Sequence, residues 1–409
     1  MTFSIQDLLQ NYECYEEPAL LHRFFKFRDL FTLIEFHNSP SSPFKLQKLG
    51  SSVKGKSIYS FTYGNGPTKV LLWSQMHGDE PTATMALFDL FNLLSDRDQQ
   101  HSELRQLLQS QLTLVFVPML NPDGAEMFTR RNALGIDLNR DYLSLSAPES
   151  TILHDLAHEF KPHFAFNLHD QSRYYAVGDT DQPVNLAFLA PSANPERTYT
   201  PARKRAVQLI AQLYDALKPI IGAQMAKYAD DYAPRCFGDS FQKAGYSTIL
   251  IESGYVPYDE EKQIVRKYTF VAILKALVTI AQGLNDDKKL IKIYEEIPLN
   301  KKEQFFDYII SGVLIEMGGK KYITDLGVNV IDQLTANSSS RPQRSYWLAD
   351  VGDLRAFHAF KHIRTRGLRL QSKNPIQFGQ KADFKLYDNK KIILEFAHGI
   401  LKRKVADIL

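Results

Sequence analysis

Short apolar runs alternate with longer amphipathic segments over the first 285 residues. Residues 70–73, 112–117, 164–168 and 247–251 are near-continuously apolar and rich in β-branched or aromatic side chains, which predicts buried strands. Apolar residues at helical spacing predict helices over residues 81–96, 147–160, 201–217 and 261–284. Strands that alternate with helices predict an α/β domain with a mixed, mostly parallel twisted sheet flanked by helices.

The pattern changes after residues 285–289, where short β-like runs are separated by the turn sequences MGGKK and YDNKK. We therefore predict a first domain over residues 1–290, with residues 1–45 packed on it. A smaller β-rich domain is predicted over residues 295–409.

Composition excludes several classes of protein. Charged residues make up 23% of the chain and hydrophobic residues 44%, a soluble globular balance, and the net charge of +3 is dispersed. No basic footprint for nucleic acid and no polybasic membrane anchor stands out. The N-terminus lacks a signal-peptide pattern, and no apolar run approaches the length of a membrane span, so we expect a cytoplasmic location. The oligomeric state is not readable.

Polar clusters follow the predicted strands. HGDE (77–80) follows the first, NPDG and a segment from 121 to 142 follow the second, HDQ (169–171) the third and ESGY (252–255) the fourth. The carboxyl ends of strands in such sheets are where α/β folds usually hold their ligands. HGDEP alone is equally typical of a strand-to-helix turn, so the other clusters must decide whether it belongs to a functional site.

A zinc site accounts for this set of residues. His77 and Glu80 are three residues apart across a tight turn and can reach one ion, and His169 can complete the ligand set. Glu252 would then be free to act as the general base on a water molecule that the metal activates. Arginines in the second cluster could stabilise an oxyanion or clamp a substrate carboxylate.

HGDE, NPDG, RRNALGIDLNRD, NLHD and ILIESGY, in this order, resemble the motifs of the zinc carboxypeptidases, the M14 peptidase family. The resemblance covers residues 48–255. The stretch LGSSVKGKSIYSFTYGNG (49–66) is similar to the opening strands of the family's bacterial branch. One HxxE motif is weak evidence, but five motifs in order are specific.

The resemblance implies a role for each matching residue. His77, Glu80 and His169 would bind one Zn²⁺ per chain, and Asp137 would orient His77. Arg130 would polarise the scissile carbonyl, with Arg131 as its competitor.

The substrate-binding residues follow from the same resemblance. Asn139 and Arg140 would hold the terminal carboxylate of the substrate, and Glu252 would be the base and proton shuttle. Tyr232 is the better match for the mobile tyrosine of the family, with Tyr228 as the alternative. In FGDSF, Gly238 would lie near the position that selects the terminal side chain and would offer no fixed charge there.

The sequence therefore predicts a zinc metallocarboxypeptidase acting on peptides with a free carboxylate. A rival interpretation is a deacylase of the aspartoacylase and succinylglutamate desuccinylase type, which hydrolyses N-acyl amino acids. A third is a non-catalytic peptide-binding homologue. His154 and His158 are spaced for a metal on a helix, but no carboxylate cluster accompanies them, so we interpret them as an ordinary helix face.

Overall fold

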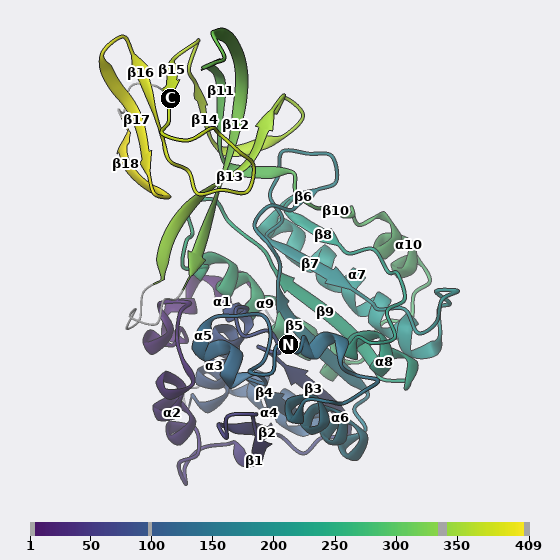
Figure 1. Cartoon of the computed structure of the whole chain (residues 1–409). Coiled ribbons are helices and arrows are strands. Elements are labelled where there is room, and N and C mark those ends of the chain that lie inside the picture. The colour runs from purple at the N-terminus through teal and green to yellow at the C-terminus, as the bar shows by residue number, and fades with distance from the viewer. Residues whose placement is uncertain (1–4, 97–99, 334–341, 405–409) are drawn as a thin grey trace. The chain divides into compact units, whose positions relative to one another are not determined.

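A computed structural model describes residues 5–96, 100–333 and 342–404 of the chain (Figure 1). Two compact units share these residues. The first contains residues 5–173 and 182–300, and the second contains residues 174–181 and the described residues from 301 to 404.

A mixed sheet forms the centre of the first unit, with the strand order β1-β2-β4-β3-β5-β9-β7-β8. The central strands β4, β3, β5 and β9 run parallel. The pairs β1–β2, β2–β4 and β7–β9 are antiparallel, and β8 runs parallel to β7. This is the mixed, mostly parallel sheet that the sequence predicted. The strands are β1 (Lys45–Ser51), β2 (Ser57–Tyr63), β3 (Thr68–Trp73), β4 (Leu112–Val117), β5 (Phe164–Asp170), β7 (Leu186–Leu189), β8 (Met225–Lys227) and β9 (Ser247–Ser253).

Helices cover both faces of this sheet, as the alternation of strands and helices predicted. The last long helix ends before Gly283, where a backbone φ of 89° suits glycine. The helices are α1 (Ile5–Gln10), α2 (Phe27–Phe36), α3 (Thr82–Ser95), α4 (Ser102–Gln111), α5 (Pro122–Met127), α6 (Pro148–Phe160), α7 (Pro201–Ile221), α8 (Phe237–Lys243), α9 (Gln263–Gln282) and α10 (Lys289–Glu296).

Successive side chains of a strand point to opposite faces of the sheet, so each central strand supplies two cores. In β3, Val70 and Leu72 join the core under α3, α7 and α9, whereas Leu71 and Trp73 join the core under α6 and α8. In β5, Phe166 belongs to the first core and Ala165 to the second. By the same alternation Asn167 and His169 face the side of α6 and α8.

A buried ion pair ties the N-terminal segment to this unit. The side chains of Asp89 on α3 and Arg266 on α9 are fully buried and paired. Tyr12 donates its hydroxyl hydrogen to Asp89 (2.7 Å), and the backbone N–H of Glu17 donates to the same carboxylate (2.8 Å). A fully buried pair needs such additional hydrogen bonds, because its charges have lost their hydration.

The second unit is β-rich. Its main sheet has the order β13-β12-β11-β15-β16-β17-β18, with β14 also paired to β11, and β6 pairs with β10. No helix among the described residues is long and apolar enough to cross a bilayer. The strands are β6 (Ala176–Val177), β10 (Asn300–Lys301), β11 (Phe305–Met317), β12 (Lys320–Gln333), β13 (Gln343–Gly352), β14 (His358–Arg364), β15 (Arg369–Gln371), β16 (Phe384–Asp388), β17 (Lys391–Ala397) and β18 (Ile400–Lys404).

Candidate metal centre and active site

The loop between β3 and α3 carries two of the three predicted metal ligands. Gln75 begins this loop in the left-handed region, with a φ of 47°. Its side chain donates to the carbonyl of Gly78 (3.1 Å) and accepts from the Thr84 hydroxyl (2.9 Å). These contacts hold an unfavourable backbone conformation in place and bring His77 and Glu80 to the edge of the sheet.

A close backbone approach explains the glycine in HGDE. A Cβ atom on Gly78 would lie 2.0 Å from the backbone carbon of Gly124, which belongs to NPDG. Asn121 of the same motif donates to the carbonyl of Met76 (3.2 Å) and accepts from the Gly124 N–H (2.8 Å). The two motifs therefore form one packed layer, and NPDG supports the ligand loop.

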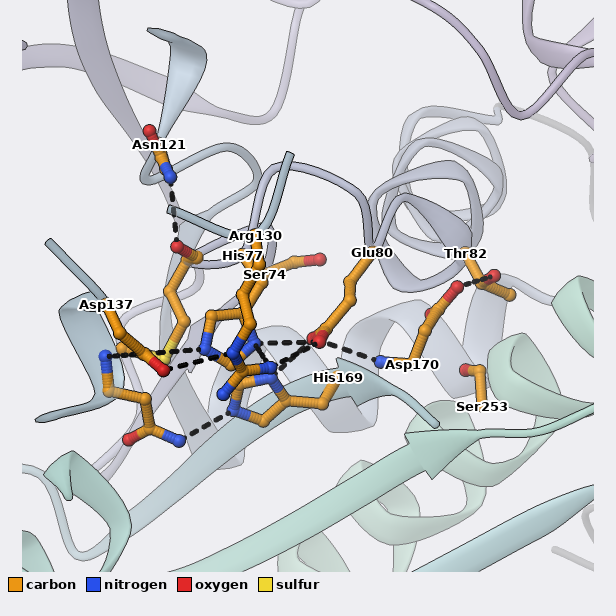
Figure 2. Close-up of polar contacts among 12 residues, drawn as sticks. Ser74, His77, Glu80, Thr82, Asn121, Arg130, Asp137, His169, Asp170 and Ser253 are labelled. Atoms are coloured by element: carbon orange, nitrogen blue, oxygen red, sulfur yellow. Dashed lines mark hydrogen bonds and ion pairs between the residues drawn. The ribbon is translucent and has the colours of Figure 1, made fainter. Parts of the chain in front are cut away.

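His77, Glu80 and His169 come together as predicted, and all three are buried. Glu80 Oε1 lies 2.7 Å from His77 Nδ1, and Glu80 Oε2 lies 2.6 Å from His169 Nδ1. One ligand atom from each residue lies within 4.8 Å of the others. Figure 2 shows the three side chains turned toward one another, with Asp137 beside the His77 ring.

Asp137 provides a test of whether this group suits a metal ion. Its Oδ1 lies 3.1 Å from His77 Nε2, and an ionised carboxylate can only accept, so Nε2 carries a proton. In neutral His77 this leaves Nδ1 as a bare acceptor 2.7 Å from an acceptor oxygen of Glu80. That contact needs positive charge beside it, which a second proton, a metal ion or the Arg130 guanidinium can supply, since Arg130 Nη1 lies 3.0 Å from Nδ1 and 3.3 Å from Oε1. Two imidazoles and one carboxylate are the ligand types of a catalytic zinc site, so the residues fit zinc.

The charges of the group depend strongly on one another. Burial alone would lower the pKa of His77, but Glu80 and the hydrogen bond to Asp137 outweigh it and raise this pKa to about 9. Burial opposes the negative charge of Glu80, yet His77 and His169 hold its pKa well below the usual range. The centre therefore favours a carboxylate with positive charge directly beside it.

The structure separates the two arginine candidates. Arg130 donates from Nε to Asp137 (3.0 Å), and its Nη1 lies 3.0 Å from His77 Nδ1 and 3.3 Å from Glu80 Oε1. Arg131 is exposed and donates to the carbonyl of Gly135 (2.9 Å). Of the two arginines, only Arg130 reaches the proposed metal ligands, and its guanidinium already faces them.

Glu252 lies on β9, the strand next to β5. It pairs in register with His169, and paired residues of parallel neighbours face the same side of the sheet. Although the residue is partly exposed, its carboxyl group is surrounded by protein. Burial raises the pKa of its carboxyl well above the usual range, and the neighbouring Glu80 carboxylate raises it further. Positive charge at the proposed ligand group lowers the pKa of Glu252, as the His77 charge does in this structure.

Asn139 connects the centre to α8. Its side-chain Nδ2 lies 3.3 Å from His169 Nε2, and its Oδ1 accepts from the Phe237 N–H (3.1 Å). Arg140 is exposed, and Nη1 donates to the Asn139 carbonyl (2.7 Å) and to Cys236 Sγ (3.0 Å). The predicted carboxylate-binding pair therefore lies between His169 and the start of α8.

Tyr232 is partly buried in the segment between β8 and α8. This segment is anchored at Asp230, which pairs with the buried Arg203 and whose carbonyl accepts from Ser192 Oγ (2.6 Å). The role of Tyr232 over a substrate stays a prediction, as does the alternative, Tyr228.

Sequence reasoning missed the part played by Asp170. Its backbone N–H donates to Glu80 Oε2 (3.2 Å), and its side chain accepts from Thr82 (2.6 Å) (Figure 2). The same side chain also accepts from Lys262 (2.9 Å). Asp170 follows His169 directly in HDQ, which was the available signal. Lys262 carried no signal, because its approach depends on the fold.

Comparisons with known proteins find carboxypeptidases. Residues 32–196 match the family model of the zinc carboxypeptidases. Carboxypeptidase 2 from Trichophyton rubrum is 29% identical over 112 residues, which are 27% of this chain and 20% of that protein. Carboxypeptidase SOL1 from Arabidopsis thaliana is 31% identical over 104 residues, 24% of this chain and 21% of that protein. The matches thus span about a fifth of the length of these relatives.

Solved structures show the same fold. A metallo-carboxypeptidase from Burkholderia cenocepacia superposes with a TM-score of 0.50 at 19% identity, covering 63% of this chain and 70% of that one. Bovine thrombin-activatable fibrinolysis inhibitor gives 0.51 at 14% identity, covering 66% and 99%. The fold is that of these solved carboxypeptidases, and residues 32–196 match the model of the zinc carboxypeptidases. The motifs had predicted both.

Proposed function

We propose that this protein is a zinc metallocarboxypeptidase that releases single C-terminal residues from peptides. One observation carries this proposal. In the His77–Glu80–His169 group the His77 ring contacts Asp137, and Glu252 is in register with His169 on the neighbouring strand. A ligand set with a positioned acid that does not belong to it is what metal-assisted hydrolysis requires.

The chemistry divides among the residues present. Zinc, when bound, supplies Lewis-acid activation of water and of a carbonyl group. The Glu252 carboxylate takes the proton of the attacking water and returns it to the leaving amine. The Arg130 guanidinium donates hydrogen bonds to the carbonyl oxygen as negative charge develops there.

Asn139 and Arg140 make the enzyme exo-acting in this proposal. A guanidinium binds a carboxylate through paired hydrogen bonds, and Asn139 adds an amide beside it. Because Asn139 also contacts His169, a carboxylate held by this pair places the last peptide bond of the substrate next to the ligand group. A substrate without a free terminal carboxylate should not be positioned.

A substrate panel tests the proposal. The zinc-loaded protein is given a set of peptides, the same peptides with amidated C-termini, and N-acyl amino acids, and products are identified by mass spectrometry. Loss of single C-terminal residues from the free peptides alone is the expected result. Cleavage only of N-acyl amino acids would favour the deacylase, and no cleavage at all would favour a non-catalytic peptide-binding protein.

The cytoplasmic location expected from the sequence also stays a prediction. Fractionation of cells that express the protein from its own gene, followed by immunodetection, would test it. Recovery outside the cytoplasm would overturn it. The oligomeric state can be measured on the same preparation.

A further inference from the structure

We propose that Lys262 is a positioning residue, which acts through Asp170 to fix the proposed base against the proposed metal ligands. This inference rests on the proposed carboxypeptidase function and adds a residue on which that function depends. It is carried by a buried ion pair that the proposed mechanism does not use, and by the contacts that this pair makes on both of its sides.

The Lys262–Asp170 pair lies where a strand ends and a helix begins. Asp170 is the last residue of β5 and directly follows the proposed ligand His169, whereas Lys262 comes immediately before α9. Lys262 Nζ lies 2.9 Å from Asp170 Oδ2, and the two side chains are only 10% and 5% exposed. Because a pair this deeply buried has lost most of its hydration, each charge depends on the position of the other.

Asp170 connects this pair to the ligand loop by two contacts (Figure 2). Its backbone N–H donates to Glu80 Oε2 (3.2 Å), in the carboxylate that also contacts both histidine rings. Its Oδ2 accepts from Thr82 Oγ1 (2.6 Å), which lies two residues after Glu80 at the start of α3. Asp170 therefore ties the end of β5 to the segment that carries Glu80.

Lys262 extends the connection to the strand of the proposed base. Ser253 directly follows Glu252 on β9 and pairs in register with Asp170. Lys262 Nζ lies 3.4 Å from the Ser253 carbonyl oxygen, the longer of its two contacts. The ammonium thus bridges the residue that follows His169 and the residue that follows Glu252.

The backbone at Lys262 is held in an unfavourable conformation. Its φ of 56° lies in the left-handed region, which is costly for a residue with a Cβ atom. The Lys262 N–H donates to the Asp259 carbonyl (3.1 Å), and its own carbonyl accepts from the Arg266 N–H (2.8 Å). Such strain persists only where the surrounding structure fixes it, so the backbone from which the ammonium reaches the strand ends is itself fixed.

Loss of this bridge should change two quantities. Glu80 would lose the fixed position of an N–H donor, and loss of a partner that orients a metal ligand costs about 10- to 100-fold in metal affinity. Glu252 would lose its fixed place relative to the ligands, and a displacement of about 1 Å can lower the rate about 100-fold. KM should change little, because Asn139 and Arg140 do not belong to the bridge.

The test uses a single and a double variant. Lys262→Met keeps the length of the side chain but leaves the Asp170 carboxylate buried without its counter-charge, which also costs stability. Asp170→Asn/Lys262→Met removes both charges, and neutral side chains in place of a buried ion pair are often no less stable. The double variant therefore keeps the inference testable if Lys262→Met does not fold.

For the double variant we expect zinc affinity about tenfold lower in competition with a chelator. We also expect kcat about 10- to 100-fold lower, with KM within about twofold of the wild type. Asp89→Asn is the control, since it breaks a fully buried pair that also joins α3 and α9, about two turns further along α3. It should lose stability in urea unfolding and keep its zinc affinity.

A zinc affinity or a kcat of the folded double variant within about twofold of the wild type would overturn the inference, because the pair would then serve stability alone. Zinc affinity is measured without a substrate, so the inference is tested whether or not peptides are cleaved. Absence of peptide hydrolysis in the zinc-loaded wild type would instead overturn the proposed function.

Discussion

Asp137 makes three hydrogen bonds at the proposed metal centre, one of them to the ring of the proposed ligand His77, so its removal should change zinc affinity even without a substrate. Oδ1 accepts from His77 Nε2 (3.1 Å) and from the Asn139 N–H (3.0 Å), and Oδ2 accepts from Arg130 Nε (3.0 Å). Asp137→Ala frees the His77 ring to rotate and removes the charge that increases its basicity. Loss of such a partner costs about 10- to 100-fold in metal affinity, which corresponds to about 1.4–2.7 kcal/mol.

The assay is a competition for zinc between the protein and a chromophoric chelator, which requires no substrate. Asp141→Ala is the matched control, because Asp141 is also buried and accepts two backbone N–H groups, from Ser146 (3.1 Å) and Ala147 (2.9 Å). It should lose stability and keep zinc affinity. Asp137→Asn should fall between the wild type and Asp137→Ala, because an amide oxygen can still accept from His77. Zinc affinity of Asp137→Ala within twofold of the wild type would refute this reasoning.

Two further predictions concern stability. His37 is 1% exposed, and burial lowers its pKa from 6.5 to about 4. Between these pH values the unfolded chain therefore binds more protons than the folded protein, so the free energy of unfolding falls as the pH falls through that window. Between about pH 7.5 and pH 5, the free energy of unfolding measured with urea should fall by about 2 kcal/mol in the wild type and by much less in His37→Phe. Equal losses in both proteins would contradict this prediction. Asp89→Asn leaves the fully buried Arg266 without its counter-charge and should cost about 3–5 kcal/mol by the same method. A cost below about 1 kcal/mol, the range of an exposed pair, would show that Arg266 is not confined as described.

The local patterns of the sequence predicted the centre of the fold well. The run at 112–117 matches β4 at both ends, and the run at 164–168 begins with β5, which continues through His169 to Asp170. These strands are apolar on both faces because both faces are covered, so the composition of each run is sufficient to identify it. The short strands β7 and β8 at one end of the sheet and the helix α8 gave no comparable pattern and were not predicted.

The grouping of the three proposed metal ligands was also predictable, because the spacing of His77 and Glu80 in a turn and the place of His169 at a strand end are local features. The choice between Arg130 and Arg131 was not, since adjacent residues differ only in the direction of their side chains.

The most direct test of the central claim compares the wild type with Glu252→Gln after zinc loading. Glutamine keeps the size of the side chain and removes its capacity to take a proton, and Glu252 is not among the proposed ligands. We expect one zinc per chain in both proteins, release of single C-terminal residues by the wild type, and a loss of at least about 100-fold in kcat for the variant. Equal activity of the two proteins, both with zinc bound, would contradict the assignment of Glu252 as the base and with it the proposed mechanism.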